Sequence, residues 1–359
     1  MYSFLRGIKM FLERNKYYKT MEEEFGGPVL AYITGDKPNW GTQIAQDAID
    51  IFIEQLEKIG PVSRLILFLY TRGGDTSVAW NIVNLLRMYS NELVVIVPHK
   101  AHSAGTIISL GADRIIMTKQ ATLSPIDPSL AAPLCPTDMN GQNQPVSVEA
   151  INGFIELARN EFNIKTDQMA MASVLNNLSE KVHPLVLGQA YRSRAQIKML
   201  ASRLLVRQLN GDKKKINKVT KFLCSESGSH DYTINRSEAL KDLGLKIEKP
   251  TENQYSLIKG LYDDFSNELG LNDSSFPRLT VGTQYSVKRA FIESSFGGSD
   301  YYVSEGKVEI LQSQNGAIQQ QFTRFFDGWR HEKFPLDQIS VISNKGEEVI
   351  YEKDDKFSI

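Results

Sequence analysis

Short apolar segments that alternate with amphipathic stretches constrain the fold of this chain more than any other feature of its sequence. Residues 65–70 and 93–97 are almost continuously apolar, which is typical of strands buried on both faces of a sheet. The stretch that follows each of them carries apolar residues at helical spacing. Because strands that alternate with helices form parallel sheets, we predict an α/β fold with ligands at the carboxyl ends of the strands.

The neighbouring segments follow the same pattern. Residues 29–34 and 114–118 predict two further strands. Residues 42–59 predict a helix with Thr42 as its cap, and Thr76 is the predicted cap of the next helix. The sheet is therefore expected to contain at least these repeated strand–helix units.

At 359 residues the chain exceeds one minimal domain, and its composition changes along its length. We predict an N-terminal arm at 1–25 and an α/β domain at 26–250, which carries a helical insertion at about 147–209. Residues 251–359 hold many of the aromatic side chains and several hairpin-like pieces. They predict a small α+β C-terminal region.

Composition argues against several classes of partner. Lys+Arg 41 against Asp+Glu 42 gives a net charge of −1, so no overall field attracts nucleic acid. None of the 5 histidines pairs with cysteine or carboxylate at ligand spacing, so we expect no metal. The sequence lacks a phosphate-binding loop, so we expect no nucleotide-driven motor, and nothing in it calls for a cofactor.

Cysteine content and hydropathy bear on location. The 2 cysteines form no metal or redox motif, and no apolar run reaches membrane-spanning length, which predicts a cytoplasmic protein. Residues 1–19 are basic and carry apolar side chains, so two interpretations stay open. One is a helix in peripheral contact with a membrane surface, and the other is an arm packed on its own domain or on a neighbouring subunit.

Ser103 follows the apolar run at 93–97 and opens a helical stretch of small residues. A serine at such a strand-to-helix turn is held rigidly beside backbone N–H groups, a geometry that acyl-transfer nucleophiles use. The alternative is a helix N-cap, the commonest role of serine at a turn of this kind. The glycine pair at 73–74 either offers bare N–H groups to an oxyanion or forms a plain turn with positive φ.

Four short motifs in a fixed order make a more specific pattern. They are TRGGD at 71–75, HSAGT at 102–106, ADRIIM at 112–117 and LSPIDP at 123–128. As a set they closely resemble the Clp-fold serine proteinases of the SDH (serine dehydrogenase proteinase) family. These are relatives of signal peptide peptidase A and, more distantly, of ClpP and the crotonases. The resemblance covers about residues 29–247 and implies a ClpP/crotonase-like spiral of βα units.

The resemblance implies an ATP-independent serine peptidase that acts on protein or peptide substrates with Ser103 as nucleophile. The N–H groups of Gly73 and Ala104 match the oxyanion hole, and Gly74 lets the substrate backbone approach closely. Members of the family bind an extended peptide as an added strand. Because they enclose their sites in rings, a homo-oligomer is implied, with the helical insertion supplying contacts between subunits.

This chain differs from ClpP-type enzymes in the residues that could serve as the general base. Those enzymes carry a histidine after the strand that follows the serine helix, whereas residues 123–127 contain none. Asp231 falls where ClpP has its triad aspartate, but it cannot complete that relay without the histidine. Signal peptide peptidase A relatives use a lysine that precedes a long helix, a place that Lys181 occupies here. His183 is the rival base, since an imidazole titrates near neutrality without any shift.

Two other functions stay open. A crotonase-like acyl-CoA enzyme shares the oxyanion turn but needs an acid/base carboxylate and a CoA pocket instead of a nucleophile. A catalytically inactive Clp-fold scaffold would bind protein segments without reacting with them. Position 72, which is proline in many relatives, is Arg72 here and adds charge near the predicted site.

Overall fold

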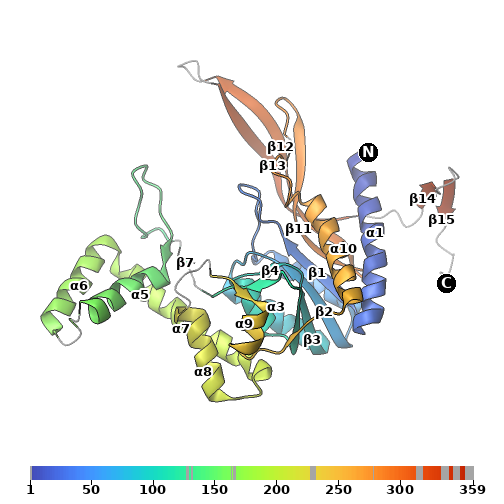
Figure 1. Ribbon diagram of the computed structural model, residues 1–359. Helices are drawn as coiled ribbons and strands as arrows, with labels where there is room; N and C mark the ends of the chain where they lie inside the picture. The colour runs from blue at the N-terminus through green and yellow to red at the C-terminus, as the bar shows by residue number, and fades with distance from the viewer. Residues whose placement is uncertain are drawn as a thin grey trace.

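The computed structural model describes residues 2–126, 129–130, 132–162, 164, 167–226, 232–277, 279–312, 318–332, 339–342 and 348–351. An eight-stranded sheet crosses the middle of the molecule in the order β10-β5-β3-β2-β1-β11-β12-β13 (Figure 1). The first part of this sheet is parallel, which confirms the predicted α/β class. Its strands are β10, Ile247–Glu248; β5, Arg114–Met117; β3, Ser90–Val97; β2, Val62–Tyr70; and β1, Val29–Thr34.

Alternate side chains of the parallel strands enter two cores, one on each face of the sheet. Leu67 and Val95 belong to the core on one face, and Phe68 and Ile96 belong to the core on the other. Both faces are therefore dry, which is why these strands are almost continuously apolar. The first core is covered by α2, Ala48–Ile59, α3, Thr76–Tyr89, and α4, Ala104–Leu110; the second is covered by α1, Tyr2–Phe25, and α10, Glu252–Glu268.

Two helices have N-caps other than the predicted ones. Helix α2 starts at Ala48 instead of near Thr42, because the chain before it pairs with the glycine turn. The Ile44 N–H donates to the Gly73 carbonyl at 2.8 Å. Helix α3 is capped by Asp75, whose carboxylate accepts from the first backbone N–H groups of the helix, so Thr76 is already helical.

The C-terminal part of the chain continues the central sheet. Strand β11, Gln284–Ser294, pairs antiparallel with β1, and β12, Gly298–Gln312, and β13, Ile318–His331, follow as antiparallel neighbours. A separate pair is formed by β14, Ile339–Ile342, and β15, Glu348–Tyr351. Whether residue 250 divides two folding units stays a prediction.

Short strands lie next to the parallel part of the sheet. One small sheet has the order β4-β6-β9, and a second joins β7 to β8. The bounds are β4, Lys100–Ala101; β6, Thr122–Leu123; β9, Ile234–Asn235; β7, Ser129–Leu130; and β8, Val146–Ser147.

The region predicted as an insertion is helical and projects from the sheet (Figure 1). Helix α6 contains no buried side chain, whereas the second half of α7 packs into the core through Ile197, Ala201 and Leu205. The helices here are α5, Val148–Glu156; a π-helical turn, Leu157–Glu161; α6, Gln168–Lys181; and α7, Pro184–Gln208. They are followed by α8, Lys213–Lys221, a second π-helical turn, Phe222–Glu226, and α9, Arg236–Lys241.

The first helix is fastened to the rest of the chain by a buried ion cluster. Arg14, whose side chain is 1% exposed, donates to Glu293 at 2.7 Å and to Asp264 and Glu268 on α10. The Tyr18 hydroxyl donates to the same Glu293 carboxylate at 2.9 Å. Of the two interpretations of the arm, packing on its own domain therefore describes α1 from residue 11 onward.

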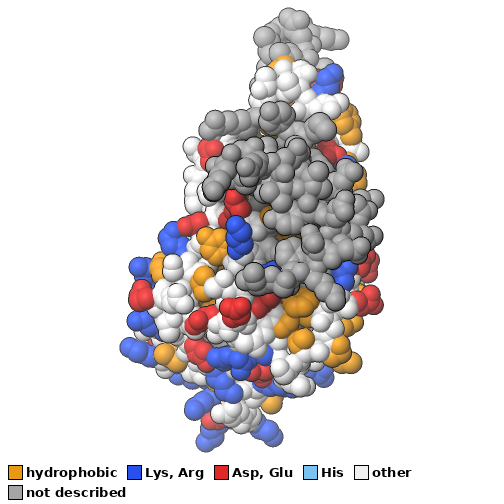
Figure 2. Space-filling model, turned by 90° about the vertical axis from the view of Figure 1, so that its right-hand side faces the viewer, with side chains coloured by type: hydrophobic (Ala, Val, Ile, Leu, Met, Phe, Trp, Pro, Cys, Tyr) orange, Lys and Arg blue, Asp and Glu red, His pale blue; other side chains and the backbone are white. Residues whose placement is uncertain are grey.

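The face of the molecule on the right-hand side of Figure 1 carries charges of both signs. Figure 2 shows Lys and Arg interspersed with Asp and Glu on the visible part of the face, around smaller hydrophobic areas. This mixture agrees with the net charge of −1. Among the described helices, none is both long and apolar enough to cross a membrane.

We expect Arg14→Ala to destabilise the fold by about 3–5 kcal/mol, because the Glu293 carboxylate then stays buried without its cationic partner. Urea unfolding at neutral pH measures this loss. The matched control is Arg207→Ala, whose ion pair with Asp113 involves an arginine side chain that is 60% exposed. That change should cost no more than about 1 kcal/mol. Equal losses for the two variants would contradict the assigned role of Arg14.

Candidate active site

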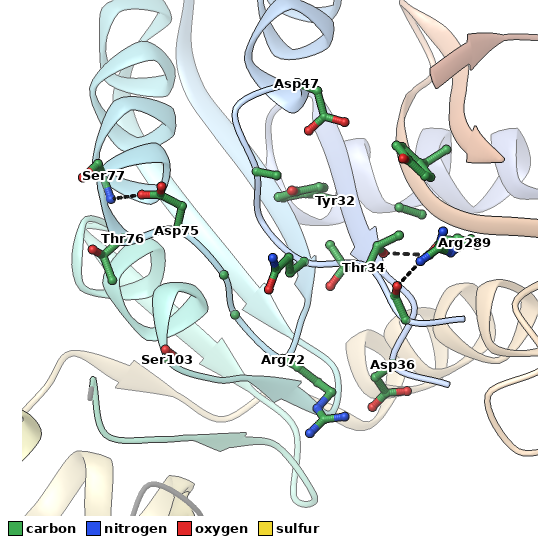
Figure 3. A pocket seen from close by; sticks show the side chains of 18 of the residues that line it. Tyr32, Thr34, Asp36, Asp47, Arg72, Asp75, Thr76, Ser77, Ser103 and Arg289 are labelled. Atoms are coloured by element: carbon green, nitrogen blue, oxygen red, sulfur yellow. Dashed lines mark hydrogen bonds between the residues drawn. The ribbon is translucent and has the colours of Figure 1, made fainter. Parts of the chain in front are cut away.

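A cavity of about 1280 Å³ lies at the carboxyl ends of β1 and β2 (Figure 3). Its wall includes Gly73, Gly74 and Ser103. Helix α7 and the C-terminal strands also contribute to it, through residues such as Gln196 and Arg289. Residues from both ends of the chain thus line one space at the edge of the sheet where α/β proteins bind ligands.

The loops that follow β2 and β3 are joined beyond the ends of the two strands. The Thr71 N–H donates to the Lys100 carbonyl at 3.1 Å, and the His102 N–H donates to the Thr71 carbonyl at 3.1 Å. Thr71 and Ala101 form a parallel bridge by these bonds. The glycine turn and Ser103, 30 or so residues apart in sequence, are therefore held side by side.

Ser103 has an unusual backbone conformation, with φ 51° and ψ −113°. A residue other than glycine costs on the order of 1–3 kcal/mol in such a region, and strain of this kind clusters at functional sites. Ser103 occupies the N-cap position of α4, yet its side chain makes no capping hydrogen bond. The side chain faces the cavity instead, with 9% of the residue exposed.

Two buried side chains from neighbouring segments hold this turn in place. The Ser103 N–H donates to Ser124 Oγ at 2.7 Å. Thr106 and Ser124 are tied in turn, because Thr106 Oγ1 donates to the Ser124 carbonyl and accepts from the Ser124 N–H. Sequence reasoning gave Ser124 no role of its own, although it lies in one of the four motifs. Its position beside Ser103 arises from pairing of β4 with β6, which no local pattern reveals.

Gly73 lies against Ser103 so closely that no side chain fits between them. With φ 114°, it would place an added Cβ 2.7 Å from Ser103 Cβ and 3.2 Å from the Ala104 nitrogen. The Gly73 N–H donates to Thr71 Oγ1 at 3.0 Å. Ala104 is the first residue of α4, where backbone N–H groups have no acceptor within the helix. The three residues predicted as nucleophile and oxyanion donors are thus neighbours.

Gly74 is in close contact with the chain's own backbone. An added Cβ would lie 2.3 Å from the Ile44 carbonyl oxygen, and the Asp75 N–H donates to that oxygen at 2.8 Å. The segment before α2 therefore leaves room only for glycine at position 74. Its predicted contribution to substrate binding is a separate matter and stays a prediction.

The predicted bases lie outside this cavity. Lys181 ends α6, and His183 caps α7, with its Nδ1 accepting from the Leu185 N–H at 3.2 Å. Both side chains are exposed, and neither lines the cavity. Asp231 lies outside the described residues. Among the described residues of the cavity wall, the single lysine is Lys37, and its Nζ already donates to the Asp273 carbonyl.

A partly buried carboxylate, that of Asp36, borders the cavity. Its carboxylate receives hydrogen bonds from Lys100 Nζ at 2.7 Å and from the Tyr70 hydroxyl at 3.1 Å. Burial raises the pKa of Tyr70, and the nearby Tyr262 and Asp36 raise it further. Tyr70 is therefore a hydrogen-bond donor that keeps its proton. No group of three His, Cys, Asp or Glu side chains in the described part of the chain is arranged to hold a metal ion.

Comparisons with known proteins agree with part of this picture. Residues 41–144 match the family model described as ClpP-like SDH-type serine proteinase, which confirms the resemblance over that segment. The chain is 28% identical over 240 residues to the uncharacterized protein MJ0137 of Methanocaldococcus jannaschii, covering 66% of this chain and 68% of that protein. It is 29% identical over 209 residues to MJ1495 of the same archaeon, covering 55% of this chain and 59% of that protein.

Two solved structures show a distant resemblance to this chain. One is a 1510-N membrane-bound stomatin-specific protease in complex with a substrate peptide, with 18% identity and a TM-score of 0.34, covering 59% of this chain and 73% of that one. Another is a monofunctional enoyl CoA isomerase from M. smegmatis, with 13% identity and a TM-score of 0.30, covering 67% of this chain and 88% of that one.

We expect Gly73→Ala to abolish labelling of Ser103 by a fluorophosphonate, because the new methyl group would displace the serine. Gly60→Ala is the matched control, since Gly60 also has positive φ but an added Cβ there meets nothing within 4 Å. The control should lose about 1–3 kcal/mol of stability from backbone strain and keep its labelling. Gel fluorescence after labelling and thermal unfolding separate the two effects. Normal labelling of Gly73→Ala would contradict the contact.

Ser124→Ala should slow the labelling of Ser103 and destabilise the fold by about 1–3 kcal/mol, because the Ser103 N–H then loses its buried acceptor. The control is Ser109→Ala, which removes another buried hydroxyl, one that donates to the Gly105 carbonyl at 2.9 Å. Labelling rates are compared at a temperature where both variants are folded. Equal rates in the two variants would show that Ser124 does not position Ser103.

Proposed function

Because residues 41–144 match the ClpP-like SDH-type serine proteinase family, we propose that this chain is a serine peptidase with Ser103 as its nucleophile. The observation that carries the proposal is the strained backbone of Ser103, whose hydroxyl caps no helix and faces the cavity. A serine that only capped α4 would adopt ordinary backbone angles and accept from the first turn. The strained backbone of Ser103 gives helix α4 no capping hydrogen bond, which points to a chemical role for the residue.

The proposed reaction follows from the neighbours of Ser103. Its Oγ attacks the carbonyl carbon of a peptide bond while a general base removes the hydroxyl proton. The oxyanion that forms accepts from the Ala104 N–H, and from the Gly73 N–H once that group turns from Thr71. The base then gives the proton to the leaving amine. Water hydrolyses the acyl-enzyme, so the reaction needs neither ATP nor a cofactor.

We place the base in a neighbouring copy of the chain. Lys181 and His183 are exposed and lie outside their own cavity, on the helical segment that projects from the sheet. The same segment exposes large apolar side chains, including Met169 at 84% and Leu185 at 68%. A homo-oligomer that covered these side chains would desolvate Lys181, as a lysine base requires to lose its proton near neutral pH.

The substrate we propose is an extended segment of protein or peptide. The cavity at the edge of the sheet is large enough to hold several residues of such a segment. Both cysteines, Cys135 and Cys224, are free and buried, which suits a reducing compartment such as the cytoplasm.

We expect a fluorophosphonate to label the full chain at Ser103 and to leave Ser103→Ala unlabelled. Peptide mapping by mass spectrometry identifies the modified residue. A folded wild-type chain that takes up no label would overturn the peptidase proposal. It would favour the inactive scaffold, since that alternative needs the same cavity but no activated serine.

Mixing of variants assigns the base and its source. Lys181→Ala should lower the labelling rate at least a hundredfold if Lys181 is the base, and His183→Ala serves as the paired comparison. If the base comes from another copy, adding Ser103→Ala chains, which keep Lys181 and His183, should restore labelling of the base variant in mixed oligomers. Analytical ultracentrifugation measures whether oligomers form. Monomers that label at the full rate would contradict the shared site.

A further inference from the structure

We propose that Arg72 determines substrate specificity by binding a carboxylate of the peptide close to the bond that is cleaved. The inference rests on the proposed peptidase function and goes beyond it by naming a class of substrate, peptides with an acidic side chain or terminal carboxylate near the scissile bond. Two observations support it. Arg72 lies beside the candidate nucleophile, and every other charged residue described in the cavity wall already has a hydrogen-bond or ion-pair partner.

Arg72 is placed directly beside the candidate chemistry. It precedes Gly73, whose backbone packs against Ser103, and it is exposed in the wall of the cavity. Figure 3 shows its side chain extending from the glycine turn, away from Asp75 and toward the region of Asp36. A group held by this guanidinium would therefore belong to a residue near the carbonyl that Ser103 attacks.

The carboxylates of the cavity wall already have partners. Asp36 is paired with Lys100 at 2.7 Å, and Asp75 accepts from the Ser77 N–H at 2.7 Å. Asp47 accepts from Trp329 Nε1 at 3.0 Å. The fourth carboxylate, that of Asp327, is shared by the two arginines described next. None of them competes for the guanidinium of Arg72 within ion-pair distance.

The other cations of the wall are also engaged. Arg289 pairs with Asp327 at 3.2 Å and donates to Ser304 Oγ at 2.9 Å, and Arg324 lies 3.5 Å from the second oxygen of Asp327. Lys37 donates to the Asp273 carbonyl. Arg72 alone among the described charged residues of the wall makes no ion pair or hydrogen bond within the described chain.

The unpaired guanidinium decides which ligand the cavity favours. The wall carries four carboxylates, Asp36, Asp47, Asp75 and Asp327, and four cations, Lys37, Arg72, Arg289 and Arg324, so the overall charge selects neither sign. A guanidinium presents a planar fork of N–H donors that matches a carboxylate with two parallel hydrogen bonds. A substrate carboxylate would complete the pairing that this chain leaves open.

Two other roles for Arg72 predict different behaviour. If it stabilised the oxyanion, its loss would slow the reaction with every substrate by the same factor. If it were only a solvated surface side chain, its loss would change no rate. A specificity residue instead changes the ratio between acidic and neutral substrates.

The test uses peptidyl phosphonates that react covalently with serine peptidases and differ only in one side chain, Glu, Gln or Lys, placed in turn at each position near the phosphorus. We expect the Glu probe to label Ser103 roughly tenfold or more faster than the Gln probe at one of these positions. Arg72→Gln should bring that ratio close to one, and Arg72→Glu should make the Lys probe the fastest. The control is Arg203→Gln, which removes an exposed arginine outside the cavity wall.

The outcomes separate the two proposals. Labelling of wild type with no preference for Glu at any position, or a preference that persists in Arg72→Gln, overturns the role of Arg72 and leaves the peptidase proposal intact. An equal loss of rate for all three probes in Arg72→Gln assigns Arg72 to the oxyanion and also overturns the specificity role. No labelling of Ser103 by any probe, including a neutral fluorophosphonate, overturns the peptidase proposal itself and this inference with it.

Discussion

The contact between the Gly73 backbone and Ser103 is the constraint on which the candidate site depends. Strands β2 and β3 are parallel neighbours, so the loops that follow them leave the sheet at the same edge. The bridge between Thr71 and Ala101 extends the strand pairing into those loops. It thereby holds the glycine turn in contact with Ser103. Any side chain at position 73 would break this contact. Ser103 therefore sits in a strained conformation that its surroundings, above all Ser124, hold in place.

The rest of the fold serves this edge of the sheet in two ways. Helices α1 and α10 close the far face, and the buried cluster around Arg14 ties them to β11. The C-terminal strands also line the cavity, since Arg289 of β11 and Trp329 of β13 belong to its wall. The antiparallel extension of the sheet thus supplies part of the space in which a substrate would bind.

Sequence patterns revealed the parallel core well, because burial on both faces leaves a strong apolar signal. Strand β1 has the predicted bounds, and β2 and β3 contain the predicted runs. The start of α2 was predicted too early, since the pairing of Ile44 with Gly74 is a contact between distant segments. The pairing of β11 with β1 and the role of Ser124 escaped notice for the same reason. Local periodicity reports burial, whereas strand neighbours depend on the whole chain.

The most direct measurement is a crystal structure of the chain with a phosphonate covalently bound. It tests together the roles proposed for Ser103, Ala104 and a base from a second copy. The account predicts a bond from phosphorus to Ser103 Oγ, with a phosphonate oxygen accepting from the Ala104 N–H. It also predicts that Lys181 or His183 of another copy lies within hydrogen-bond distance of Ser103 Oγ. A phosphonate attached elsewhere, or an oxygen that points away from α4, would contradict it.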